Sequence, residues 1–140
     1  MNTSSMKNMT WFLITGILGA VQITLAQVRF AAETYESDPE KYLGQRVTIL
    51  VDSVSVPAVN ATSEDDEFRL FSVSTKGQRQ GEYVWGGSIY VKVSKNDAAA
   101  FVKRHNSSTA KVPKNVSGTF LKGDAKEKYI YDSFYIDCTR

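Results

Sequence analysis

The chain has 140 residues, with 17 lysines and arginines against 15 aspartates and glutamates and a single cysteine. This length suits one domain with one modest core, and the near balance of charge excludes a uniformly basic or acidic protein. A single cysteine cannot form a disulfide within the chain, which excludes a disulfide-stabilised scaffold.

Residues 1–26 have the pattern of a secretory signal peptide. Lys7 is their only charged residue, and Trp11–Leu25 is mostly apolar. Thr24 and Ala26 then place small residues at the positions that a signal peptidase reads. The apolar run is shorter than the ~20 residues that a membrane-spanning helix needs. We therefore expect cleavage after Ala26 and export to the periplasm or the exterior, with an uncleaved membrane anchor as the alternative.

Charge is divided unevenly along the remainder of the chain. Gln27–Glu67 holds three basic and nine acidic residues, whereas Phe68–Lys128 holds twelve basic and four acidic ones. A chain divided in this way can present one electropositive surface at almost no net charge. The alternative is that these residues form ordinary solvated faces.

The first predicted elements lie in the acidic half of the chain. Residues 27–38 are polar after their first few positions and predict a linker or a short turn of helix. Gly44 then supplies a turn before a long strand over Arg46–Val56. The apolar alternation changes face within this strand, which predicts a bulge or bend near Asp52 and Ser53.

The remaining pattern predicts four more strands and one helix. The helix covers Lys95–His105, with Ser94 or Asn96 as its cap and Phe101 in its apolar stripe. Between the second and third strands, Thr75–Gly87 reads as a long loop in which Gly86 and Gly87 provide a turn. The predicted strands are Phe68–Ser74, Ser88–Ser94, Asn115–Leu121 and Tyr129–Asp137.

Three strands, a helix and two further strands form the element order of the OB-fold. Tyr42–Thr48, Gly87–Val93, the alanine-rich helix through Phe101 and Val116–Leu121 resemble OB-fold proteins, in particular small exported bacterial ones. The resemblance implies a mainly β, five-stranded Greek-key barrel over residues 39–137, with its helix between the third and fourth strands and Phe101 at one end. OB-folds bind oligonucleotides, oligosaccharides or proteins, so the resemblance implies binding without selecting a ligand.

Catalytic and metal patterns are missing from the sequence. His105 is the only histidine, Cys138 the only cysteine, and neither has a partner at a recognisable spacing. The acidic run Glu64–Glu67 is consecutive, unlike the spaced ligands of a calcium loop. Asp132, expected on the last strand, is the one acid flanked there by large apolar residues, and we expect it to face outward. We therefore expect a non-enzymatic protein without a cofactor.

Basic and aromatic residues gather around the predicted loop and the third strand. An aromatic surface beside cations suits single-stranded nucleic acid, while the same aromatics suit a sugar or a protein partner. Alternatively, Trp85 packs against the rim and the tyrosines are strand formers. We expect an adaptor for a protein or envelope component first, with nucleic acid or another polyanion and oligosaccharide as alternatives. The candidate binding residues are Lys76, Arg79, Tyr83, Trp85, Tyr90 and Lys92.

Overall fold

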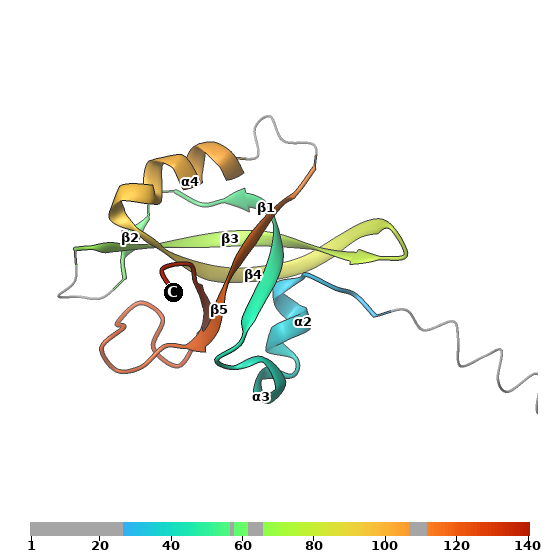
Figure 1. Ribbon diagram of the computed structural model, residues 1–140, viewed down its shortest axis with the longest axis horizontal. Coiled ribbons are helices and arrows are strands. Elements are labelled where there is room, and N and C mark those ends of the chain that lie inside the picture. Colours follow the sequence, from blue (N-terminus) through green and yellow to red (C-terminus); the bar gives the residue numbers. More distant parts are fainter. Residues whose placement is uncertain (1–26, 57, 62–65, 107–111) are drawn as a thin grey trace, which may run out of the picture.

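The computed structural model describes residues 27–56, 58–61, 66–106 and 112–140 (Figure 1). The predicted signal peptide lies outside the described residues. No helix in the described part of the chain is long and apolar enough to cross a membrane. In chain order the elements are α2 (Ala32–Glu36), α3 (Pro39–Tyr42), β1 (Arg46–Val54), β2 (Val59–Asn60), β3 (Phe68–Arg79), β4 (Glu82–Ser94), η1 (Lys95–Asp97), α4 (Ala98–His105), β5 (Lys114–Lys122) and β6 (Phe134–Asp137).

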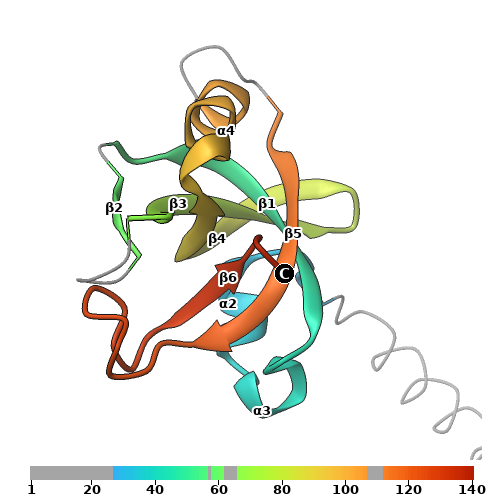
Figure 2. The same ribbon diagram turned by 60° about the vertical axis from the view of Figure 1, so that its left-hand side comes forward.

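Five of the strands close into a ring. The sheet order is β1-β5-β6-β4-β3-β2. β1 also pairs with β3, and this pairing closes β1, β5, β6, β4 and β3 into the ring (Figure 2). The pairs are antiparallel except β4 with β6, which run parallel. The described residues hold six strands where five were predicted, because the connection between β1 and β3 contains the two-residue strand β2, which pairs with β3.

β1 belongs to both sides of the ring. It pairs with β5 from Arg46 to Val51 and with β3 from Leu50 to Val54, and its register with β3 shifts between Val51 and Ser53. The predicted bulge is therefore confirmed. A bulge increases local bend and twist, which lets one strand serve two directions of pairing. Gly44 also has the predicted turn conformation, with φ of +79°.

The prediction of a loop over residues 75–87 is wrong. β3 and β4 continue as a paired hairpin to Arg79 and Glu82. Gln80 and Gly81 form its turn, with φ of 52° and 79°, the positive values that two-residue hairpin turns favour. Gly86 and Gly87 lie within β4 opposite Thr75, where the register shifts, so they form part of a bulge. The glycines and charged residues of this segment suggested a loop. A hairpin that projects from the domain does not pack one face on the core, so its strands lack the alternating apolar residues by which a strand is recognised.

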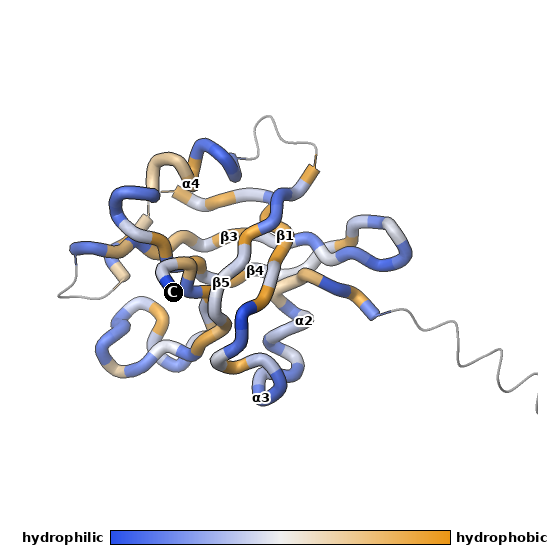
Figure 3. The backbone as a smooth tube through the Cα atoms, in the orientation of Figure 1, coloured by the Kyte–Doolittle hydropathy of each residue, from blue (hydrophilic) through white to orange (hydrophobic). Residues whose placement is uncertain are grey.

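The main core fills the ring and includes the N-terminal segment. Phe71, Phe120 and Ile136 are buried inside it, and Figure 3 shows hydrophobic residues along the strands of the ring. Ala32 and Tyr35 of α2 belong to the same core cluster. Residues 27–38 are thus part of the domain, and the linker alternative is wrong. Three residues of this polar segment are buried, Ala31, Ala32 and Tyr35, too few to give a clear periodicity.

Phe101 on α4 stacks on Phe71, with ring centroids 5.2 Å apart. The helix therefore covers the core through the residue predicted to do so. Its first turn is the 3-10 helix η1, and the Ser94 hydroxyl accepts the Asp97 N–H at 3.2 Å as the predicted cap.

The last strand is shorter than predicted, since β6 begins only at Phe134. Asp132 has φ of +60° in the preceding turn and pairs with Lys122 at 2.9 Å, so the expected outward position holds although the strand does not reach it. Within that turn, Ile130 joins Ala61, Leu70 and Tyr135 in a second, smaller apolar cluster.

Candidate functional site

The β3–β4 hairpin projects beyond the rest of the domain (Figure 1). We call residues 76–85 the hairpin arm. Lys76 pairs with Trp85 across the two strands, and Gln78 pairs with Tyr83. Trp85 and Tyr83 are 59% and 48% exposed, and the Lys76 Nζ lies 5.7 Å from the centroid of the Trp85 ring. The arm therefore offers two aromatic side chains with a cation beside one of them.

The N-terminal segment supports the base of the arm. Arg29 and Gln78 exchange backbone hydrogen bonds of 3.0 and 2.9 Å. The Thr75 hydroxyl faces the Gly86 and Gly87 carbonyl oxygens at 2.8 and 2.9 Å and accepts the Ala32 N–H at 3.0 Å. These bonds fix the arm at its base, so its aromatics are presented on a backbone anchored from both strands.

A recess of about 440 Å³ lies between Trp85 and the N-terminal helices. Thr34 and Ser37 from α2 and its cap line it, together with Lys41 and Tyr42 from α3. Trp85 is thus one wall of a concave surface, and it does not lie packed away against the rim.

The six predicted binding residues divide into two groups. Lys76, Arg79, Tyr83 and Trp85 lie together on the hairpin arm, with Arg79 beside the turn and paired to Glu82. Tyr90 and Lys92 lie farther along β4.

Lys92 is 7% exposed, and its Nζ lies 4.5 Å from the centroid of the Phe68 ring. The Lys92 ammonium therefore lies beside Phe68, which packs against the smaller apolar cluster, and not beside the hairpin arm.

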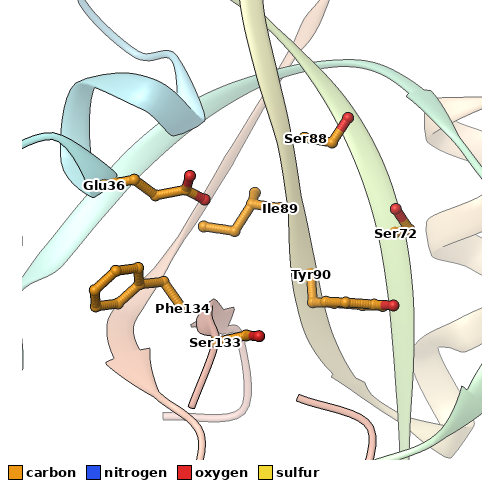
Figure 4. A pocket seen from close by; sticks show the side chains of 7 residues that line it. All are labelled: Glu36, Ser72, Ser88, Ile89, Tyr90, Ser133 and Phe134. Carbon is orange, nitrogen blue, oxygen red and sulfur yellow. The ribbon is translucent and has the colours of Figure 1, made fainter. Parts of the chain in front are cut away.

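Tyr90 lines a second hollow, of about 330 Å³, which we call the Glu36 pocket (Figure 4). It lies where α2, the β3–β4 pair and the start of β6 come together. In Figure 4 the Glu36 side chain reaches from α2 toward Ile89, with Phe134 and Ser133 below it in the view and Tyr90 to the right. The lining residues are Glu36, Ser72, Ser88, Ile89, Tyr90, Ser133 and Phe134.

Most of the Glu36 pocket was missed in the sequence. Ser72, Ser88 and Tyr90 alternate with the buried residues Phe71, Ile89 and Val91, so the period of two along β3 and β4 could have placed them on one outer face. Glu36 and Ser133 had no such signal, because only the tertiary fold brings α2 and the turn before β6 to that face.

The single cysteine and the single histidine of the chain are in surroundings that disfavour their charged forms. Burial, with Asp137 nearby, raises the pKa of the Cys138 thiol to about 11, so little thiolate exists at neutral pH. Burial, with Arg104 and Lys114 nearby, lowers the pKa of His105 to about 4, and its ring lies against Phe101 at 4.7 Å. The described residues contain no group of three or more histidine, cysteine, aspartate or glutamate side chains that could hold a metal.

The class that the fold and site define is a mainly β domain, closed by a ring of five strands, with an exposed aromatic hairpin arm and a separate polar pocket. No family model, curated protein or solved structure matches the chain.

Proposed function

We propose that this chain is an exported, non-enzymatic binding module of the OB-fold type, whose partner is a protein or another component of the cell envelope. The order β5-β1-β3-β4 supports the fold assignment. Three consecutive strands with a fourth that returns beside the first form a Greek key. α4 precedes that returning strand, and β6 then joins β5 to β4.

The exposed Trp85 beside its recess is the observation that carries the binding proposal. Interface hot spots are enriched in tryptophan and tyrosine and often adjoin a concavity that the partner fills. Trp85 is 59% exposed, and its neighbour across the strand, Lys76, adds charge without covering it. An aromatic pair on an anchored hairpin offers a large contact area with little conformational freedom to lose on binding.

A polyanion has weaker support on this surface. Lys76 and Arg79 remain as cations on the arm, but the buried Lys92 cannot reach a phosphate there. A protein or envelope component that contacts Trp85 is therefore our first choice, and nucleic acid is an outcome that the experiment separates.

Affinity purification from the envelope fraction of cells that make the protein tests this proposal. The wild-type chain and Trp85→Ala are compared with Tyr131→Ala, which removes an aromatic that is 64% exposed but lies off the arm. We expect a partner retained by wild type and Tyr131→Ala and lost from Trp85→Ala. Equal retention by all three would refute the arm as the binding surface. A salt-sensitive complex with a single-stranded oligonucleotide, weakened by Lys76→Ala, would favour the polyanion instead.

A further inference from the structure

The Glu36 pocket contains a carboxylate without a partner. Among the described residues, the Glu36 side chain has no hydrogen bond or ion pair, although the residue is partly buried. Burial raises the pKa of Glu36 and nearby Glu33 raises it further, so both effects disfavour the charged carboxylate. Glu36 is also the last residue of α2, where the helix carbonyls add negative potential. A positive charge placed in this pocket would offset all three effects.

The other polar groups of the pocket are hydroxyls that are also free to bind. No side-chain hydrogen bond joins Ser72, Ser88, Tyr90 or Ser133 to another described residue. Each hydroxyl oxygen can accept a hydrogen bond. Tyr90 also contributes the wall seen edge-on in Figure 4.

The second aromatic of the pocket is already engaged. Phe134 stacks on Phe120 at 5.1 Å, and the Lys122 Nζ lies 5.7 Å from its centroid. Lys122 itself pairs with Asp132 at 2.9 Å and does not line the pocket. Tyr90 packs against the smaller apolar cluster, but among the described residues its ring has no stacking or cation–π partner. Its ring can therefore contact a bound cation.

We propose that the Glu36 pocket binds an organic ammonium group, with Glu36 as its counter-ion, serine hydroxyls as further acceptors and the Tyr90 ring beside it. A free alkylamine and the lysine side chain of a protein share this chemistry. An ammonium has three donors and no acceptor, which matches one carboxylate surrounded by hydroxyl oxygens. An aromatic ring adds cation–π attraction.

Anionic ligands are disfavoured, because none of the described residues that line the pocket is a lysine, arginine or histidine, and the charged residue among them, Glu36, is acidic. A neutral polyol could use the hydroxyls but would leave the carboxylate charge uncompensated. The pocket is also separate from the hairpin arm, so this proposal does not depend on the proposed function. Trp85→Ala leaves ammonium binding unchanged, and Glu36→Gln leaves retention of the arm's partner unchanged.

Three ligands with the same five-carbon chain make the test specific. The full-length ¹⁵N-labelled protein is titrated with 1,5-diaminopentane, 1,5-pentanediol and glutarate, and backbone amide shifts are followed by NMR. We expect the diamine to shift the amides of Ser88, Tyr90 and Ser133 and the other two ligands to leave them in place. Nα-acetyl-lysine methylamide distinguishes the sources: tighter binding than the diamine indicates a protein lysine, and weaker binding a free amine.

Matched variants test the role of the carboxylate. Glu36→Gln keeps the shape and removes the charge, so we expect at least a tenfold loss of diamine affinity. Glu33→Gln, on the same helix but outside the pocket lining, keeps most of it. Saturating diamine also lowers the pKa of the Glu36 carboxyl, followed by ¹³C NMR, and the same measurement in Glu33→Gln removes the charged group that raises this pKa together with burial. Ser88→Leu fills the pocket from an exposed position, and loss of binding there supports the site even if Glu36→Gln is unstable.

Three outcomes would overturn the proposal. One is the absence of amide shifts at millimolar diamine. Another is equal binding of pentanediol, which would make the pocket a site for neutral polar ligands. Equal binding of the diamine to folded Glu36→Gln would also overturn it, because Glu36 would then not be the counter-ion of the ammonium group.

Discussion

The hydroxyl of Thr75 joins α2 to the base of the hairpin arm by hydrogen bonds. Thr75 is fully buried, and its hydroxyl accepts the Ala32 N–H at 3.0 Å while it donates to the Gly86 or the Gly87 carbonyl oxygen. Thr75→Val replaces this hydroxyl with a methyl group of similar size. The Ala32 N–H then lacks its acceptor, a loss that typically costs about 1–3 kcal/mol for a buried group. We expect Thr75→Val to lower the free energy of unfolding by about 2 kcal/mol.

Urea denaturation followed by circular dichroism measures this change, with Thr75→Ser as the matched control. Serine keeps the hydroxyl and loses one methyl, which costs about 1 kcal/mol. Hydrogen exchange supplies a local measurement, because the Ala32 amide should exchange faster in Thr75→Val than in Thr75→Ser. The reasoning is refuted if valine is no more destabilising than serine, or if the Ala32 amide keeps its protection in Thr75→Val.

Three further predictions concern the core. Phe101→Ala removes the ring stacked on Phe71 and should lower the free energy of unfolding by about 3 kcal/mol in urea melts. Lys103→Ala, at an exposed position of the same helix, should lower it little, and equal losses in the two variants would mean that α4 does not pack where the structure places it. Gly118→Ala puts a Cβ 2.6 Å from the Asp137 carbonyl oxygen, and we expect about 1–3 kcal/mol of destabilisation and a lower Tm. His105 has a folded pKa of about 4 against 6.5 when unfolded, so the unfolded state binds the extra proton. Stability should therefore fall by about 2–3 kcal/mol as the pH drops from 6.5 to 4, and His105→Leu should flatten that fall in urea melts across this range.

The parts of the fold that the sequence predicted correctly are those determined locally. The change of apolar face in the first strand gave the bulge between Val51 and Ser53. Ser94 was recognisable as a helix cap from its position before Asp97, and Phe101 from its place on the apolar stripe of the only clear helix. In each case the residues that determine the structure are neighbours in the chain, so spacing alone carries the information.

The hairpin arm was not predicted because its strands do not pack one apolar face against the core. β3 beyond Thr75 reads Lys76, Gly77, Gln78, Arg79, which shows no apolar alternation. Its glycine faces Val28 and Ala31 of the N-terminal segment, where a side chain would collide. The hairpin arm is defined by the pairing of β3 with β4 and by the contact with residues 28–31. The N-terminal residues that make this contact lie outside the segment that was predicted to be a loop.

The candidate sites follow the same division between local and distant information. The aromatic and basic composition around residues 76–92 pointed to the hairpin arm. Composition could not distinguish the exposed Trp85 from the buried Lys92, because both residues lie on β4 and composition does not show which part of that strand is covered. The carboxylate of the Glu36 pocket comes from a segment that showed no functional pattern at all. It acquires its environment only when α2 enters the core through Ala32 and Tyr35, which places Glu36 in one pocket with residues of β4. The same contacts that make residues 27–38 part of the domain thus create its one unpaired, partly buried acid in the pocket, and a substitution that loosens α2 should weaken ammonium binding without touching the pocket itself.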